Sequence, residues 1–277
     1  MTRPAEKAHL YDPTGRFYAV PPDILQRYGY KSTAQVWLPA VSTILDIYQA
    51  PYLRKWYGIV GLTEAERRRE QASAWGTQAH SLIEYIINGG KIKTWDGIEP
   101  EVQNCLRAWM RWVMGSKFKP AQAEMVVYSM RYGFAGMLDT VGHFGTRWGI
   151  ADWKTGSREY PDPLKFLQIA AYYQAYHETH PSSPRVKEAR LVGLNRLTGD
   201  CSELRRTARD LRHDFSAFRA ALKLWQWVRA ASDIEARDQA IREKGGTNAE
   251  EEPTGQEAAR GQEGDGRGQQ AVSAAQG

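Results

Sequence analysis

Cysteine is scarce in this sequence: its 277 residues include two, Cys105 and Cys201. Two cysteines are too few for a disulfide framework or for a four-cysteine zinc or iron–sulfur site. Apolar runs are also short, and none approaches the roughly 20 residues that a helix needs to span a bilayer. The stretch MTRPAEKAHLYDPTG contains no apolar core of a signal peptide. We therefore expect a soluble protein of a reducing compartment, most simply the cytoplasm, with no iron–sulfur cluster and no membrane partner.

Large apolar residues are nearly missing from residues 245–277. This segment has six acidic and two basic residues, a net charge of −4, whereas the whole chain carries +5, so residues 1–244 carry +9. A segment so poor in apolar surface cannot offset the entropy lost on ordering. We expect one domain over 1–244 and a disordered acidic tail over 245–277. The tail could compete with a polyanion for the basic domain surface or recruit a partner.

The spacing of apolar residues predicts an α/β domain with a mixed central sheet flanked by helices, preceded by an N-terminal helical part. Residues 8–40 read as extended and turn-rich. Thr63 and Glu66 form a capping-box pattern, which predicts the start of a helix that ends near Asn88. A turn at Gly145 and Thr146 predicts a hairpin. The other predicted elements are two short helices over 41–61 broken near Pro51, helices over 99–116, 162–180 and 209–232, and strands over 123–130, 134–144, 147–154, 185–198 and 201–207.

Asp139 and Asp152 lie on two neighbouring predicted strands, and Lys154 follows the second aspartate by two residues. Alternate strand residues point to the same face, so Asp152 and Lys154 emerge together, and hairpin pairing would place Asp139 beside them. Two adjacent carboxylates repel each other unless a cation lies between them, and Mg²⁺ or Mn²⁺ prefers oxygen ligands. The lysine can stabilise developing negative charge. The combination is typical of phosphodiester hydrolysis, although a surface carboxylate pair with one salt-bridging lysine also fits the D-x-K pattern.

Polar pairs one helical turn apart occur on either side of these strands. His80 and Glu84 share one face of the first long predicted helix. Gln168 and Tyr172 share a face of the helix that follows the D-x-K strand. Taken alone, each pair is a common polar feature of a helix core or surface. A helix directly after the D-x-K strand would bring its pair near the two aspartates.

Four stretches in this order, GTQAHSLIE, AGMLD, IADWKTG and QIAAYYQAY, resemble the PD-(D/E)xK nuclease superfamily in its RecB-like exonuclease branch. The chain is similar to the mitochondrial genome maintenance exonuclease and to related phage and bacterial exonucleases. LPAVSTILDIYQAPYLRKWYGI resembles the N-terminal pattern of that branch, with Ala40 where serine is usual, and the resemblance covers residues 37–176. It implies a restriction-endonuclease-like core and cleavage of DNA with Mg²⁺ or Mn²⁺. The CRISPR-associated branch holds an iron–sulfur cluster on four cysteines, so this chain departs from it.

The resemblance also implies the metal ligands and the catalytic lysine. His80, Asp139 and Asp152 match metal ligands, and the carbonyl of Trp153 matches a further one. Lys154 matches the catalytic lysine, so the catalytic residues implied are Lys154 and the two aspartates.

Further residues match supporting positions of the family. Gln168 and Tyr172 match a Q-x-x-x-Y motif that lines the site and contacts DNA. Glu84 and Glu124 stand where related enzymes carry supporting acids. Basic residues close to these motifs are candidates for nucleic-acid contact, because they can meet phosphates while neighbouring aromatics stack on unpaired bases. A solvated helix face and buried core aromatics are the more frequent fates of such patterns. The candidates are Arg54, Lys55, Arg67, Arg68, Arg69 and Arg158.

The leading hypothesis is a metal-dependent DNA exonuclease that acts on single strands or duplex ends. Phage or bacterial recombination, repair or replication would be its setting, with a recombinase or single-strand-binding protein as a candidate partner. The alternatives are a structure-selective or restriction-type endonuclease of the same superfamily, and a catalytically silent DNA-binding module. The sequence contains no helix-turn-helix or zinc-finger pattern for base readout, which favours recognition of an end or a single strand.

Overall fold

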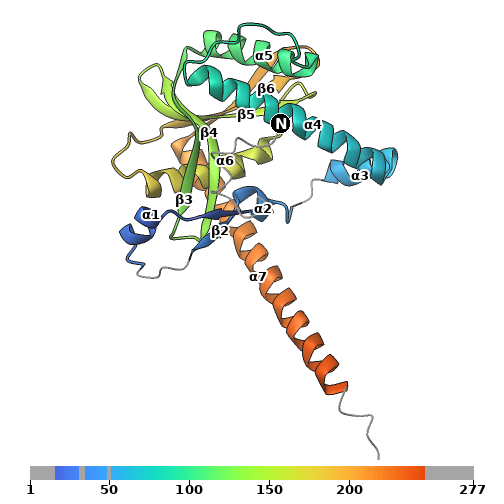
Figure 1. Cartoon of the computed structure of the whole chain (residues 1–277). Helices are drawn as coiled ribbons and strands as arrows, with labels where there is room; N and C mark the ends of the chain where they lie inside the picture. Colours follow the sequence, from blue (N-terminus) through green and yellow to red (C-terminus); the bar gives the residue numbers. More distant parts are fainter. Residues whose placement is uncertain (1–15, 31–34, 49–50, 247–277) are drawn as a thin grey trace, which may run out of the picture. The chain divides into compact units, whose positions relative to one another are not determined.

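The structure is a computed structural model that describes residues 16–30, 35–48 and 51–246. The predicted tail over 245–277 lies outside these residues, apart from Gly245 and Gly246. The chain divides into two compact units, Met1–Arg229 and Ala230–Gly277. The elements (Figure 1) are β1 (Phe17–Ala19), α1 (Pro22–Arg27), β2 (Trp37–Pro39), α2 (Val41–Leu45), α3 (Pro51–Val60), α4 (Leu62–Ile87), α5 (Pro100–Ser116), β3 (Phe118–Ser129), β4 (Phe134–Phe144), β5 (Arg147–Gly156), the short 3-10 helix η2 (Pro163–Lys165), α6 (Phe166–Thr179), β6 (Glu188–Asn195), β7 (Cys201–Thr207) and α7 (Ala208–Gly246).

A five-stranded mixed sheet forms the centre of the first unit, in the order β3-β4-β5-β6-β7. Its strands pair antiparallel except β5 and β6, which are parallel. A parallel pair requires a crossover connection, which η2 and α6 supply here. The predicted α/β class, mixed sheet and restriction-endonuclease-like core are confirmed. The predicted hairpin is also present, since β4 and β5 pair antiparallel around Gly145, whose φ is 64°.

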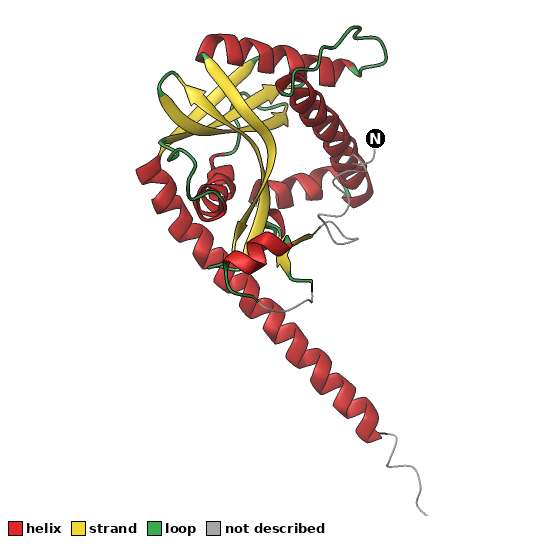
Figure 2. Cartoon of the chain, turned by 60° about the vertical axis from the view of Figure 1, so that its left-hand side comes forward, coloured by secondary structure: helices red, strands yellow, loops and turns green. Residues whose placement is uncertain are grey.

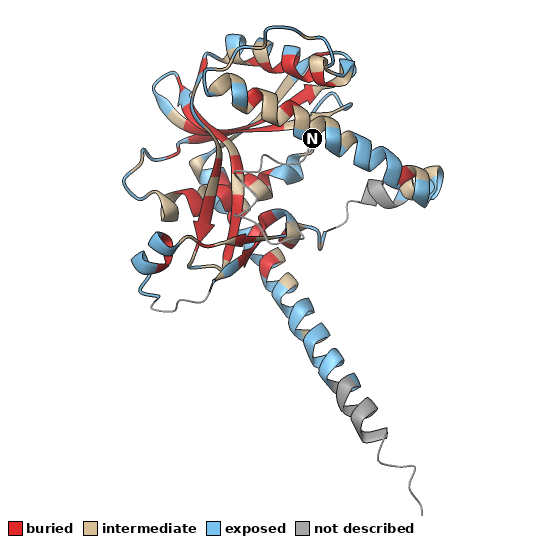
Figure 3. Ribbon diagram, in the orientation of Figure 1, coloured by how far each residue is buried: buried red, intermediate tan, exposed pale blue. Residues whose placement is uncertain are grey.

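Helices cover both faces of this sheet (Figure 2). On one face, Ala151 and Trp153 of β5 join a core with α4 and α5. On the other, Ile150 joins a core with α6 and the first turns of α7. This alternation follows from the two-residue period of a strand, so Asp152 and Lys154 share the face of Ile150. Buried residues gather on the strands and on the helix sides turned toward them (Figure 3).

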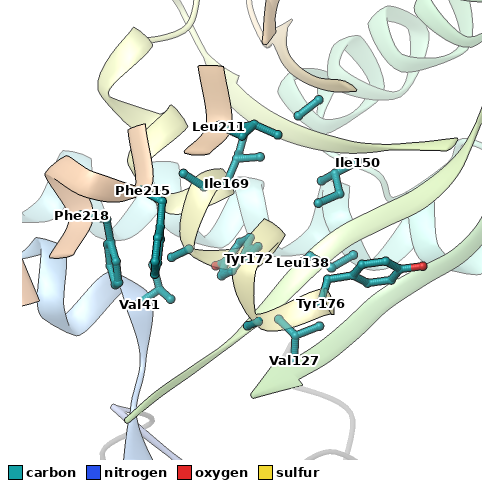
Figure 4. Close-up of a cluster of buried hydrophobic side chains, with 14 of the residues drawn as sticks. Val41, Val127, Leu138, Ile150, Ile169, Tyr172, Tyr176, Leu211, Phe215 and Phe218 are labelled. Atoms are coloured by element: carbon teal, nitrogen blue, oxygen red, sulfur yellow. The ribbon is translucent and has the colours of Figure 1, made fainter. Parts of the chain in front are cut away.

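The core on the α6 side is built from large aliphatic and aromatic side chains (Figure 4). Leu138, Ile150 and Ile169 are fully buried in it, and each contributes roughly 1.5–3 kcal/mol by leaving water. Tyr172 of α6 packs directly against Gly136 of β4, where an added Cβ would lie 2.3 Å from the tyrosine ring. Any other residue at position 136 would therefore push α6 away from the sheet.

The N-terminal part differs from the sequence prediction in two places. β1 and β2 pair antiparallel, as an extended segment should, but a helix, α1, begins at Pro22 between them. Its six residues are too few to show helical periodicity, although proline favours the first helical turn. The capping box at Thr63 is wrong: the N-cap of α4 is Gly61, two residues earlier, and no side chain caps the helix.

Candidate metal and catalytic site

β4 and β5 separate at one end of their ladder, and the candidate site lies there. The last described pair is Thr140 with Ala151, so Asp139 and Asp152 are the next residues along the two strands. The Trp153 N–H donates a hydrogen bond to Asp139 Oδ2 over 2.7 Å. The carboxylate of Asp139 thus satisfies a backbone donor at the point where the ladder stops, and this contact fixes its position.

Glu124 lies opposite Asp139 on β3. The register pairs Ala123 with Thr140 and Met125 with Leu138, which leaves Glu124 and Asp139 facing each other between two regular pairs. Glu124 has a φ of 51°, in the left-handed region that non-glycine residues seldom adopt. Strain of this kind costs about 1–3 kcal/mol and gathers at functional sites. Glu124, Asp139 and Asp152 therefore occupy matching positions on three adjacent strands.

His80 reaches this row from α4. Its Nδ1 lies 3.4 Å from Asp139 Oδ1 and 4.0 Å from Glu124 Oε1. Gly76, one turn earlier, lets α4 approach β5 closely, because an added Cβ would lie 3.0 Å from Thr155 Oγ1. Ligand atoms of His80, Glu124 and Asp139 all lie within 4.8 Å of one another. Helix α4 and strands β3 and β4 thus bring together one imidazole and two carboxylates.

These three side chains fit a divalent cation. Carboxylate oxygens suit Mg²⁺ and Mn²⁺, and an imidazole nitrogen is a common ligand of transition metals. The three side chains are 11–24 % exposed, so each is partly accessible to solvent and mostly buried. Asp152 is not a member of this group. The assignment of Asp152 and of the Trp153 carbonyl as metal ligands stays a prediction.

Asp152 and Lys154 form an ion pair beside the group. Asp152 Oδ2 lies 2.5 Å from Lys154 Nζ, and the aspartate side chain is 1 % exposed. Burial raises the pKa of Asp152 to about 6, against the opposing charge of Lys154 and with help from Asp139. Burial alone would lower the pKa of Lys154, but Asp152 and Asp139 outweigh it and raise that pKa overall. Lys154 therefore remains a cation at neutral pH, as stabilisation of negative charge requires.

His80 and Asp139 shift each other's pKa. Burial would raise the pKa of Asp139, but His80 and then Lys154 lower it overall. Burial would lower the pKa of His80, but Asp139 and Glu124 raise it overall. The carboxylates that stabilise a proton on His80 are those that would ligate a cation. A proton and a cation therefore compete for this centre.

Gln168 and Tyr172 lie on α6 and are joined by a hydrogen bond of 2.6 Å from the glutamine Nε2 to the tyrosine hydroxyl. Tyr172 is 5 % exposed and belongs to the hydrophobic core (Figure 4). Burial, followed by the charge of Asp152, raises the pKa of Tyr172 well above its usual value. The tyrosine hydroxyl is therefore neutral and lies within electrostatic reach of the site. Contact of this pair with DNA stays a prediction.

Three of the other predicted residues lie elsewhere on α4. Glu84 follows His80 by one turn of α4, is half-buried and is not a member of the three-residue group. Arg67 and Arg68 each lie 2.7 Å from Glu64, and their hydrogen bonds lower the pKa of Glu64 to about 2.

The remaining basic candidates occupy α3, α4 and the loop after β5. Lys55 is exposed on α3, and the side chain of Arg54 lies outside the described part of the chain. Arg69 donates a hydrogen bond to the hydroxyl of Tyr57 over 3.0 Å. Arg158 lines a pocket together with Lys154, so the structure places it beside the site, where the sequence predicts it.

Comparison with known proteins gives a family match. Residues 101–244 match the family model described as PD-(D/E)XK nuclease superfamily. No curated protein matches this chain. Among solved structures, the alkaline exonuclease LHK-Exo from Laribacter hongkongensis is 13 % identical with a TM-score of 0.27, covering 70 % of this chain and 93 % of that one. LHK-Exo in complex with dAMP is 15 % identical with a TM-score of 0.24, covering 57 % and 86 %. The family match includes Glu124, Asp139, Asp152 and Lys154, whereas His80 precedes it.

No helix among the described residues is long and apolar enough to cross a membrane.

Proposed function

Since the chain belongs to the PD-(D/E)XK nuclease superfamily, we propose that it is a metal-dependent DNA exonuclease whose centre is built on His80, Glu124 and Asp139. The observation that carries the proposal is the position of this three-residue group beside the buried pair of Asp152 and Lys154. Candidate metal-ligating atoms and a cationic lysine lie together where β4 and β5 separate. A nuclease needs both, because the phosphate it cuts is an anion that becomes more negative as water attacks.

Each residue has a role that follows from its surroundings. His80, Glu124 and Asp139 would hold Mg²⁺ or Mn²⁺, which when bound supplies Lewis-acid stabilisation to the scissile phosphate. Lys154 donates hydrogen bonds to that phosphate and stabilises its developing charge. Asp152 orients Lys154 through their 2.5 Å contact. The hydrogen bond from the Trp153 N–H holds Asp139 in place.

The exonuclease mode, the choice of DNA and the biological setting rest on the resemblance of the sequence to RecB-like exonucleases. On that ground we assign the enzyme to single strands or duplex ends, in phage or bacterial recombination, repair or replication. A recombinase or single-strand-binding protein is the partner that such a role would use. The net charge of +9 over residues 1–244 agrees with a polyanionic substrate.

The test uses end-labelled linear single-stranded and duplex DNA with a covalently closed circle. Wild type, Lys154→Ala and the control Lys187→Ala are incubated with Mg²⁺, Mn²⁺ or EDTA. Lys187 is exposed just before β6, at the opposite end of the parallel pair from Lys154. We expect metal-dependent loss of the linear substrates in wild type and in Lys187→Ala, and none in Lys154→Ala.

Three other results would revise the proposal. Nicking of the circle would establish an endonuclease. Binding without cleavage, in every metal, would leave a silent DNA-binding module. Full cleavage by Lys154→Ala would contradict the role given to Lys154. The position of the label that is released first would fix the polarity.

A further inference from the structure

A small pocket opens beside Lys154, and its described lining does not include the three metal-ligating side chains of the proposed centre. Its volume is about 190 Å³, and its lining includes Lys154, Thr155, Arg158, Tyr160, Lys165 and Gly193. The lining comes from the end of β5, the loop after it, η2 and β6. Drug-sized ligands occupy pockets of roughly 300–1,000 Å³, so this volume suits a small group rather than a whole nucleoside. We call it the Lys165 pocket.

The charges of the Lys165 pocket favour an anion. Three basic side chains, Lys154, Arg158 and Lys165, line it together with one acid, Asp162. The Asp162 carboxylate also accepts a hydrogen bond from the Leu164 N–H over 3.0 Å and so caps η2. Partial burial, followed by the charge of Lys154, lowers the pKa of Lys165. An anion between the two lysines would relieve this repulsion.

The backbone of β6 at Gly193 forms part of the pocket lining. Gly193 contributes no side chain, and an added Cβ would lie 2.7 Å from Ser202 Oγ and 3.0 Å from Pro161 Cδ. A larger residue at position 193 would therefore disturb the packing under the pocket. At the rim, Tyr160 is 53 % exposed. An exposed aromatic ring beside basic groups is a platform on which a base can stack.

We propose that the Lys165 pocket binds a second phosphate of the nucleic acid strand, next to the phosphate held at Lys154, and that Tyr160 contacts the attached nucleoside. This inference rests on the proposed nuclease function, since it takes the strand as the ligand. Lys165 and Arg158 position the strand, while Lys154 acts on the scissile group. The phosphate is either an internal phosphodiester or a terminal phosphomonoester, because both present the same anionic oxygens.

The test is a binding measurement that does not depend on cleavage. Fluorescence anisotropy in EDTA gives the Kd of short single-stranded DNA for wild type, Lys165→Met, Lys165→Arg and the control Lys187→Ala. One set of strands carries a single uncharged methylphosphonate at successive positions, and another carries a phosphate or a hydroxyl at each end. We expect Lys165→Met to weaken binding about tenfold and to reduce the slope of log Kd against log salt by about 0.7. Lys165→Arg keeps the positive charge and binds as wild type does.

A double-mutant comparison then locates the phosphate. In wild type, one methylphosphonate position or one missing terminal phosphate should weaken binding, and in Lys165→Met that same change should cost nothing further. A penalty at an internal position identifies a phosphodiester, and a penalty at an end identifies a terminal phosphate. The inference is overturned if Lys165→Met binds as wild type does, or if every substrate penalty is unchanged in the variant.

The two proposals fail in different ways. If wild type binds DNA through Lys165 but cleaves nothing with Mg²⁺ or Mn²⁺, the nuclease proposal fails and the pocket assignment stands. If wild type cleaves DNA and Lys165→Met binds and cleaves as well as Lys187→Ala does, the pocket assignment fails alone. If wild type binds no DNA at any salt concentration, both fail.

Discussion

Two charged clusters include residues of the parallel strands β5 and β6, and they are built differently. Where β6 begins, Arg190 lies within 3.6 Å of Glu188 and within 3.3 Å of Glu203. Its guanidinium is 6 % exposed and stacks on the ring of Phe144 at 3.9 Å from the centroid. Arg147 lies 3.1 Å from Glu188. This network holds arginines and acids in near-equal number, and its charges satisfy one another.

The charges of the cluster around Asp139 and Asp152 do not balance one another. Three acids, Glu124, Asp139 and Asp152, face Lys154 and a histidine that is neutral unless it takes up a proton. Buried charge of one sign costs several kcal/mol unless a counter-charge arrives. The first cluster therefore balances its own charges, whereas the second would be stabilised by a bound cation, in agreement with the proposed metal site. The two clusters differ in the ratio of acidic to basic side chains. In the sequence, both look like charged residues on strands.

The largest expected difference between the two clusters is the effect of a substitution on the cleavage rate. Glu124→Gln removes one oxygen ligand from the proposed centre and should lower the single-turnover rate about 10²–10³-fold. It should not lower the melting temperature, because it relieves repulsion between acids. Loss of stability with full activity would show that Glu124 belongs to a structural network instead.

The same chemical change in the other cluster should do the reverse. Glu203→Gln removes the negative charge that compensates buried Arg190. It also leaves one oxygen to accept the hydrogen bonds that Trp112, Arg190 and Arg205 now donate to two. We expect a loss of about 3 kcal/mol in unfolding free energy, seen as a drop of roughly 6–12 °C in melting temperature. The single-turnover rate at a temperature where the variant is folded should match wild type. If the variant has the melting temperature of wild type but cleaves slowly, the structural role given to Glu203 is wrong.

Addition of a divalent cation should stabilise the protein through the unbalanced cluster. Mg²⁺ or Mn²⁺ at about 100 times its Kd contributes about 2.7 kcal/mol. The shift in melting temperature should vanish in Asp139→Asn and persist in Glu203→Gln, measured against each variant in EDTA. An equal shift in Asp139→Asn would place the cation elsewhere.

A further effect is expected on the pH dependence of metal-free stability. The pKa of Asp152 is raised from 3.8 to about 6 in the folded state. Between these values the folded protein holds a proton that the unfolded chain has lost, so the unfolding free energy falls as pH rises through this window. The loss is at most about 3 kcal/mol. The asparagine in the variant Asp152→Asn cannot titrate. The melting temperature of the variant should therefore rise relative to that of wild type as the pH increases from about 4 to about 6. Parallel curves for the two proteins in EDTA would contradict the shift.

Much of the sheet follows from local sequence signals. β4 spans residues 134–144 and β7 spans 201–207, as the sequence predicts. β4 is an apolar run that ends at the turn of Gly145 and Thr146, and β7 begins directly after Gly199 and Asp200. β3 begins at Phe118, five residues earlier than predicted. Its first half is polar and contains Pro120, so only pairing with β4 reveals it as a strand. Helix α1 was not predicted, because six residues are too few to show a helical period.

The site was harder to predict than the sheet, and the reason is register. The D-x-K spacing places Asp152 and Lys154 on one face, and the motif order indicates His80 and Asp139. Glu124 stands out less, because its importance comes from facing Asp139 across the ladder and from its left-handed backbone. Lys165 carries no sequence signal at all. It lines the Lys165 pocket because η2 lies close to the end of β5.

The arrangement of the acids along the chain has a consequence for how the protein folds. Glu124, Asp139 and Asp152 come from three consecutive strands joined by short turns, whereas β6 joins only after the α6 crossover. Contacts between neighbours in sequence form at the least entropic cost, so we expect this meander to assemble early. The acids then meet while the chain is still crossing its folding barrier. We expect their repulsion to slow that step, and a divalent cation that binds the acids to speed folding.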